Sequence, residues 1–239
     1  MTRLLVVNAD DLGLSAAVNE GILQAHEHGI VTSASLMVRG EAAHDAARAA
    51  AERPGLGLGL HVDLGEWVCE DGEWRAAYEV VDTGDPEAVA AELERQLDAF
   101  RELTGREPDH LDSHQHVHRT EPVRSIMGVR ARELRLPLRH HGYVRYCGAF
   151  YGADSAGDPI PDAITAAALA RIVESLPAGA TELCCHPATS GDGLAYGAER
   201  VRELEALCDP LVRAALESAG VELCAFQATV RSRPVRLAM

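Results

Sequence analysis

The segment that most constrains the fold is an apolar run at residues 4–7, which leads into a pair of acidic residues, Asp10 and Asp11. Its apolar residues are consecutive rather than alternating, which favours a strand covered on both faces, as in a parallel sheet flanked by helices. Because aspartate is disfavoured inside strands, we expect the pair at the carboxyl end of this strand. Ligands of β/α folds bind at that edge, so both carboxylates are candidate functional groups.

Strand and helix patterns alternate along the rest of the chain. Further strands are predicted at 30–38, 56–61, 110–114, 137–139, 181–186 and 221–226. Helices are predicted after Ser15 and at 41–53, 86–103, 122–134, 163–176, 199–207 and 210–219. About seven β/α units with loops at one edge predict an α/β fold, a distorted and incomplete (β/α) barrel that forms one domain over residues 1–239.

Two long segments, 65–84 and 140–161, carry no strand or helix pattern. Structureless loops of this length are uncommon in compact domains unless they act as lids or binding loops. We therefore expect both to be irregular and to border the binding edge of the barrel. Their aromatic side chains either close over the core or contact a substrate, and those singled out are Trp67, Trp74, Phe150 and Tyr151.

The balance of charge limits the partners. A formal net charge of -15, from 37 acidic and 22 basic residues, disfavours nucleic acid and suits a neutral or cationic small molecule. The first apolar run is too short for a signal peptide or a membrane span, so we expect a cytoplasmic protein that does not bind membranes. Six cysteines without CxxC spacing favour reduced thiols. The sequence leaves a homodimer open.

Four predicted strands end on groups that bind metals or transfer protons. These groups are Asp10 with Asp11, His61, His114 and His186. Because a barrel brings the carboxyl ends of its strands together, residues far apart in sequence can converge on one ion. Each group also has an ordinary structural explanation, as a helix cap or a hydrogen-bonded core histidine. Their joint occurrence at four strand ends favours a metal site.

The stretch 110–118 is rich in histidine. In an extended conformation His114, His116 and His118 share one face, with alternate residues roughly 6.5 to 7 Å apart. Ligand nitrogens lie about 2.0 to 2.1 Å from an ion, so one of the three, or two if the chain curls, can bind it. His114 is nearest the strand end and is the best candidate. His116 and His118 are expected to support the site or face the substrate, and Asp112 to accept an imidazole proton.

Several motifs occur in an order typical of a known family. They are LLVVNADDLGLS from residue 4, GIVTS from 29, GLH at 59–61, HLDSHQHVH from 110, FYG from 150 and CHPA from 185. In this order they resemble the YdjC-like carbohydrate deacetylases, over residues from about 3 to about 188. The resemblance implies a distorted β/α barrel, one divalent ion, and hydrolysis of the N-acetyl group of a small-molecule amino sugar such as a chitooligosaccharide.

Position by position, the resemblance implies Asp11, His61 and His114 as metal ligands, Asp10 as general base and His186 as general acid. The ion would lower the pKa of a water, which on zinc falls from 15.7 to about 7. Asp10 would take that water's proton, and His186 would protonate the departing amine. Magnesium is often assigned to the family, whereas histidine ligands suit zinc, nickel, cobalt or iron, so the metal stays open.

Arg139, at the end of a predicted strand, is a candidate for orienting Asp10 or lowering its pKa. Two other functions compete with deacetylation. A metal-dependent phosphoesterase would need Lys or Arg to hold phosphate, and the predicted strand ends offer little beyond Arg139. A metal-dependent sugar-binding protein without turnover is the second alternative.

Overall fold

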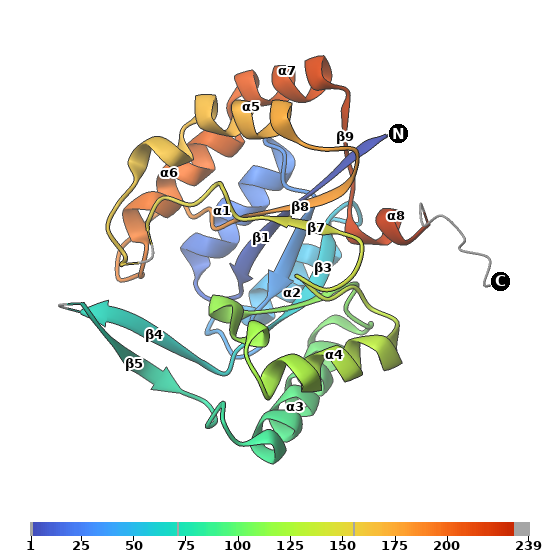
Figure 1. The fold of residues 1–239 in the computed structure, drawn as a ribbon, viewed down its shortest axis with the longest axis vertical. Coiled ribbons are helices and arrows are strands. Elements are labelled where there is room, and N and C mark those ends of the chain that lie inside the picture. Colours follow the sequence, from blue (N-terminus) through green and yellow to red (C-terminus); the bar gives the residue numbers. More distant parts are fainter. Residues whose placement is uncertain (1, 71, 155, 232–239) are drawn as a thin grey trace.

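The computed structural model describes residues 2–70, 72–154 and 156–231, and within them a parallel sheet of seven strands forms the centre. The strand order is β6-β3-β2-β1-β8-β7, and β9 also pairs with β1 (Figure 1). The strands are β1 Arg3–Leu12, β2 Ser33–Leu36, β3 Gly57–Val62, β6 Leu111–Ser113, β7 Arg145–Cys147, β8 Gly179–Cys185 and β9 Val221–Leu223. Among the described strands β6 and β7 do not pair with each other, so the sheet stays open.

Strand β1 is the middle of this sheet. It pairs with β8 along one side, and on the other side with β9 up to Leu5 and with β2 from Asn8 onward. Its residues from Leu5 to Leu12 are buried, as the continuous apolar run predicts. Asp10 and Asp11 lie at its carboxyl end, where the register with β2 shifts and Asp11 takes a left-handed conformation with φ 68°. Aspartate tolerates this conformation better than most residues, and the kink separates the directions of the two carboxylates.

Helices cover the sheet, and most begin where the sequence predicts them. The helices are α1 Ala16–Glu27, α2 Ala43–Ala51, α3 Pro86–Thr104, α4 Val123–Leu134, α5 Ala166–Ser175, α6 Gly197–Leu207, α7 Pro210–Ala219 and α8 Phe226–Arg231, with 3-10 segments at His114–Arg119 and Pro161–Ile164. Ser15 caps α1 by accepting from the Val18 amide, and Asp85 caps α3. In Figure 1, α5, α6 and α7 lie together on one side of the sheet, and α3 with α4 on the other.

The prediction of an irregular loop at 65–84 is wrong. Strands β4 Gly65–Glu70 and β5 Glu73–Glu79 pair as an antiparallel hairpin, which projects from the sheet (Figure 1). Every residue of β5 is exposed, whereas β4 is buried at Gly65 and half-buried at residues 66–69, so burial does not alternate along β5. Because strand prediction relies on alternation between a buried and an exposed face, the sequence carries little signal for these strands.

Three further predictions need correction. The predicted strand at 137–139 is reduced to two isolated bridges of Leu138, one to Leu111 and one to His141. The segment 140–161, predicted to be irregular throughout, contains β7. The predicted strand at 221–226 ends at Leu223, and α8 begins at Phe226. Strand β7, which was missed, and strand β9, whose end was misplaced, have three residues each. Strands this short cannot show the period of two that marks a strand in a sequence.

Gly59 explains the glycine-interleaved sequence of β3. A Cβ atom at this position would overlap the ring of the buried His110, so only glycine allows β3 and the residue preceding β6 to approach. Within the described residues, no helix has both the length and the apolar character needed to span a bilayer.

Candidate metal and catalytic site

The structure brings Asp11, His61 and His114 together at the carboxyl edge of the sheet. Asp11 Oδ1 lies 3.3 Å from His61 Nε2 and 3.1 Å from His114 Nδ1. One ligand atom from each of the three lies within 4.8 Å of the others. On its far side His61 Nδ1 lies 2.7 Å from Asp112 Oδ1, which favours a proton on Nδ1 and makes Nε2 the nitrogen that faces Asp11.

The donor set suits a divalent metal ion, because two imidazoles and one carboxylate leave positions open for water and substrate. Burial disfavours a charged His61 ring, but the nearby carboxylates, Asp112 and Asp10 first, outweigh it and raise the pKa of His61 to about 10. The negative charge of these carboxylates also favours a metal cation beside His61. His114 Nε2 is buried without a hydrogen-bond partner among the described residues.

A tight turn after β6 aims His114 at Asp11. Residues 114–119 form a 3-10 segment in which Gln115 and His116 take left-handed conformations with φ of 49° and 54°. Ser113 Oγ accepts from the His118 amide and holds the turn closed. The interpretation of His114, His116 and His118 as an extended run sharing one face is therefore wrong. The turn directs His116 and His118 toward His140, and His116 also lines the same cavity as Asp11, His61 and His114.

Asp10 is held by a buried arginine. Arg139 donates from Nη1 to Asp10 Oδ2 at 2.6 Å and from Nη2 to Oδ1 at 2.7 Å, and it also lies 2.8 Å from Asp112 Oδ2 and 2.6 Å from Glu182 Oε1. Asn8 donates to Asp10 Oδ1 at 2.9 Å. Burial alone would raise the pKa of Asp10, but Arg139 outweighs it and holds that pKa well below its usual range. Asp10 is therefore an oriented carboxylate anion.

His186 follows directly on β8 and lies beside Asp10. Its Nε2 is 4.0 Å from Asp10 Oδ2 and 3.9 Å from Cys184 Sγ, and its Nδ1 is 3.9 Å from Glu203 Oε1. Burial would lower the pKa of His186, but Glu203 outweighs it and raises that pKa above the ordinary 6.5. Glu203 therefore favours the protonated form of the ring.

Aromatic rings border His186. Tyr151 and Tyr196 stack with centroids 4.5 Å apart, and their centroids lie 5.6 and 5.8 Å from that of His186. Tyr151 is 41% exposed, so it is available to a ligand, whereas Phe150 is 1% exposed and packs into the hydrophobic core. Of the two aromatic residues singled out in this segment, Tyr151 is thus the one whose ring reaches solvent.

Sequence reasoning missed two charged residues of α6. Arg200 donates from Nη2 to Asp11 Oδ2 at 2.6 Å, and Glu203 faces His186. Arg200 is 4% exposed and Glu203 fully buried. A helix containing several Glu and Arg residues is typical of a solvated surface, so nothing in its sequence singles out these two.

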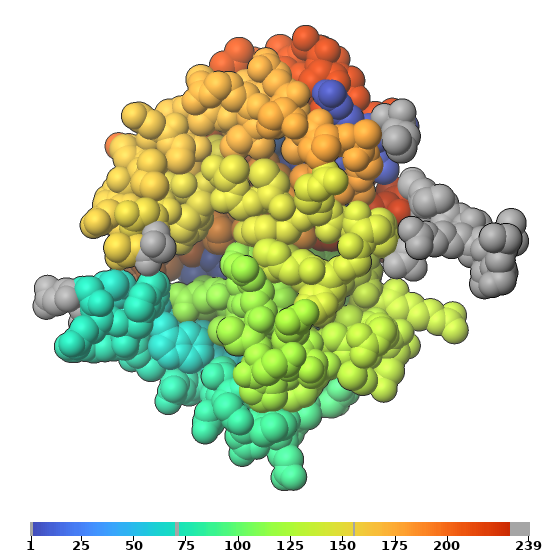
Figure 2. Space-filling view, in the orientation of Figure 1, coloured from blue at the N-terminus to red at the C-terminus, as the bar shows by residue number. Residues whose placement is uncertain are grey.

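A cavity of about 650 Å³ lies at this edge of the sheet. Asp10, Asp11, His61, His114 and His186 contribute to one part of its wall. The hairpin contributes Glu66, Trp67 and Trp74, and the opposite loops contribute Tyr151 and Tyr196. Figure 2 shows a hollow at the surface between the hairpin and these loops.

The fold is an open β/α barrel, and side chains of types that can bind a metal ion or transfer a proton gather at its strand ends. The profile of the family described as YdjC-like protein matches residues 4–218, and the chain belongs to this family. It is 34% identical to a carbohydrate deacetylase of Geobacillus stearothermophilus over 95% of this chain and 98% of that one. It is 33% identical to a chitooligosaccharide deacetylase of Serratia marcescens over 95% of this chain and 99% of that one.

Solved structures share the fold. A protein of Enterococcus faecalis named for cellobiose-phosphate cleavage superposes with a TM-score of 0.79 at 24% identity, over 95% of this chain and 99% of that one. A family 4 carbohydrate esterase of Streptomyces lividans, solved with acetate, superposes with a TM-score of 0.56 at 14% identity, over 93% and 91%. The predicted family and the predicted distorted, incomplete barrel are both confirmed.

Proposed function

We propose that the protein is a metal-dependent hydrolase that removes the N-acetyl group from an amino sugar or an N-acetylated oligosaccharide such as a chitooligosaccharide. The observation that carries the proposal is that three metal-ligating side chains, a buried carboxylate and a histidine line the same cavity. Relatives that match almost the whole chain are named carbohydrate and chitooligosaccharide deacetylases, which supports the substrate class.

Asp11, His61 and His114 would hold the ion. When bound there, a divalent ion supplies Lewis acidity, which polarises a carbonyl and makes a water more acidic. Nitrogen ligands suit zinc, cobalt, nickel or iron better than magnesium. Arg200 fixes the second oxygen of Asp11, and Asp112 fixes the ring of His61, so both positioning contacts leave the ligand atoms aimed inward.

Asp10 is the proposed general base. Arg139 keeps it ionised and fixes both oxygens, so it can take a proton from the water that attacks the acetyl carbonyl carbon. His186 is the proposed general acid, because Glu203 favours its protonated form. Its proton passes to the sugar nitrogen as the C–N bond breaks, and the products are acetate and the free amine.

The cavity wall argues against a phosphoesterase. A phosphate needs cations that are free to bind it, often Arg in a bidentate pair. Arg139 and Arg200 are each already paired, with Asp10 and Asp11 respectively, at 2.6 Å. Glu66 and Asp154 add negative charge to the lining. A neutral sugar suits this cavity better than an anion.

Acetate release tests the proposal. Metal-reconstituted protein should release acetate from N-acetylglucosamine oligomers and no phosphate from a panel of phosphate esters. His114→Ala should abolish release, while Asp45→Asn, at a carboxylate that is 70% exposed, should leave it unchanged. Phosphate release would favour the phosphoesterase, and sugar binding without acetate across several metals would favour a binding protein.

A further inference from the structure

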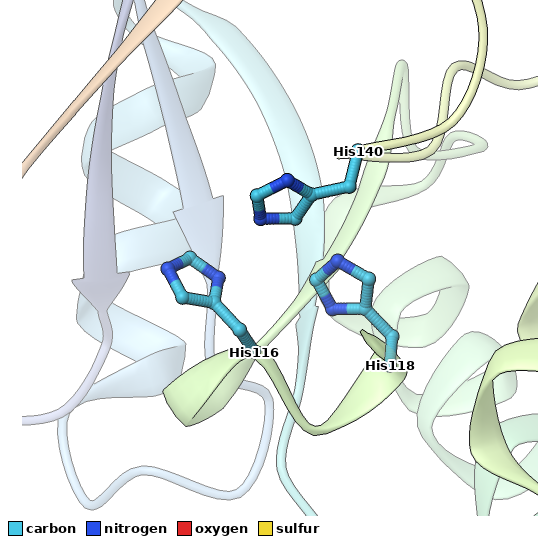
Figure 3. A group of neighbouring side chains, drawn as sticks. All are labelled: His116, His118 and His140. Carbon is cyan, nitrogen blue, oxygen red and sulfur yellow. The ribbon is translucent and has the colours of Figure 1, made fainter. Parts of the chain in front are cut away.

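Three histidines form a second cluster outside the Asp11, His61 and His114 group. His116 and His118 come from the turn after β6, and His140 follows the segment that bridges to β6 through Leu138. Figure 3 shows the three rings facing one another. Their centroids are 5.2 to 5.9 Å apart, and one nitrogen from each lies within 4.8 Å of the others.

Two of these rings present an unpartnered nitrogen while the other nitrogen is fixed. His118 Nδ1 lies 2.6 Å from Ser113 Oγ, and its Nε2 is buried without a partner. His116 Nε2 lies 3.0 Å from the Tyr146 hydroxyl, and its Nδ1 is likewise buried without a partner. A buried polar atom without a hydrogen bond is costly and calls for an explanation. Fixing one nitrogen from outside while the other stays available is the usual arrangement of a metal-binding histidine.

Packing alone does not account for the cluster. No hydrogen bond joins any two of the three rings within residues 2–70, 72–154 and 156–231, so they do not satisfy one another. Arg119 and Arg139 are the cations that act on His140, and Arg139 is engaged by Asp10, Asp112 and Glu182 at 2.6 to 2.8 Å. The carboxylates of Asp10, Asp112 and Glu182 offset the charge of Arg139.

We propose that His116, His118 and His140 form a second metal site, which takes a transition ion such as Zn²⁺, Co²⁺, Ni²⁺ or Cu²⁺ and is separate from the Asp11, His61 and His114 site. Three imidazoles without a carboxylate select these ions over Mg²⁺ or Ca²⁺, and they leave a fourth position for water. The ion would join the turn that carries His114 to the segment that carries Arg139. The bound ion would therefore stabilise the contact between these two segments beside the cavity.

Zinc stoichiometry tests this proposal. Metal-stripped protein is titrated with Zn²⁺ against a chelating indicator, and the bound metal is measured by mass spectrometry after desalting. Wild type should bind two equivalents, and both Asp11→Asn and His140→Gln should bind one. The double variant should bind none tightly. Loss of one ligand should lower the metal affinity of the second site by about ten-fold or more, because replacing a residue that only hydrogen-bonds to a ligand already costs about that much affinity.

His141→Gln is the matched control, because it removes the adjacent imidazole, which lies outside the cluster, and should keep two equivalents. His140 is exposed, so its replacement should fold, and equal thermal unfolding of the metal-stripped proteins checks this. A zinc-induced rise in Tm should persist in Asp11→Asn and vanish when His140→Gln is added.

Three results would overturn the second site. They are two equivalents in His140→Gln, equal loss in His141→Gln, or a single wild-type equivalent that Asp11→Asn removes. A single equivalent that His140→Gln removes and Asp11→Asn does not would instead support this site and contradict the proposed catalytic one.

Discussion

Replacing Arg139 tests whether this arginine stabilises the three buried carboxylates around it. It is 3% exposed and contacts Asp10, Asp112 and Glu182 at 2.6 to 2.8 Å. Removing one partner of a buried ion pair leaves uncompensated charge and costs about 3–5 kcal/mol. We expect Arg139→Met to lower the free energy of unfolding by about this amount at neutral pH, out of a total of about 5–15 kcal/mol for a typical domain.

The loss should depend on pH in a defined direction. Arg139 depresses the pKa of Asp10, so the stability that Asp10 contributes is present above the ordinary value of 3.8 and is lost as the pH falls through the folded value. Without Arg139, burial raises that pKa and the carboxylates protonate more easily. The difference between wild type and variant should therefore be largest near neutral pH and shrink toward about pH 4.

Urea unfolding followed by far-UV circular dichroism measures this difference. Trp67 and Trp74 both lie in the projecting hairpin, which makes fluorescence a poor probe of the barrel. Arg130→Met is the matched control, because Arg130 also contacts two carboxylates but at the surface, and it should cost at most about 1 kcal/mol. A loss below about 1 kcal/mol in Arg139→Met, or one that grows as the pH falls, would refute the reasoning.

Three further predictions concern the acid, the hairpin and a helix cap. Glu203→Gln should lower the pKa of His186, so the alkaline limb of the pH–rate profile for acetate release should move to lower pH; an unchanged limb would contradict the role of Glu203. Trp74→Ala, at a side chain 59% exposed, should change stability by no more than about 0.5 kcal/mol yet raise KM for N-acetylated oligosaccharides with kcat unchanged, and an unaltered KM would remove the hairpin from substrate binding. Asp85→Ala should cost about 1 kcal/mol in urea unfolding, because Asp85 accepts from two amides at the start of α3, and no loss would show that the cap is dispensable.

Much of the fold was predictable because β1 and its neighbours are buried on both faces. The signals for these elements are local in the sequence. Consecutive apolar residues mark the buried strands, Ser15 and Asp85 mark helix starts, and polar groups mark the ends of strands. The hairpin of β4 and β5 was not predicted from the sequence. Its two strands pair with each other and not with the central sheet, and β5 is exposed along its whole length. No period of two marks such strands in the sequence.

The site was predictable only in part, for a similar reason. Asp10, Asp11, His61, His114 and His186 each follow a strand, so topology alone places them at one edge. The contacts of Arg200 and Glu203 depend on how α6 packs against the sheet. In the sequence, the charged residues of α6 look like those of a solvent-exposed helix. The left-handed conformations of Gln115 and His116 were equally hidden, because neither residue type signals such a turn.

Asp11 and Asp10 are adjacent in the chain, yet we assign metal binding to the first and proton transfer to the second. The most direct test measures bound metal and acetate release together in Asp10→Asn and Asp11→Asn, both made in the His140→Gln background so that one site is counted. The account predicts that Asp10→Asn keeps one equivalent of metal and loses acetate release, whereas Asp11→Asn loses both. Undiminished acetate release by Asp10→Asn, or a full equivalent of metal in Asp11→Asn, would contradict it.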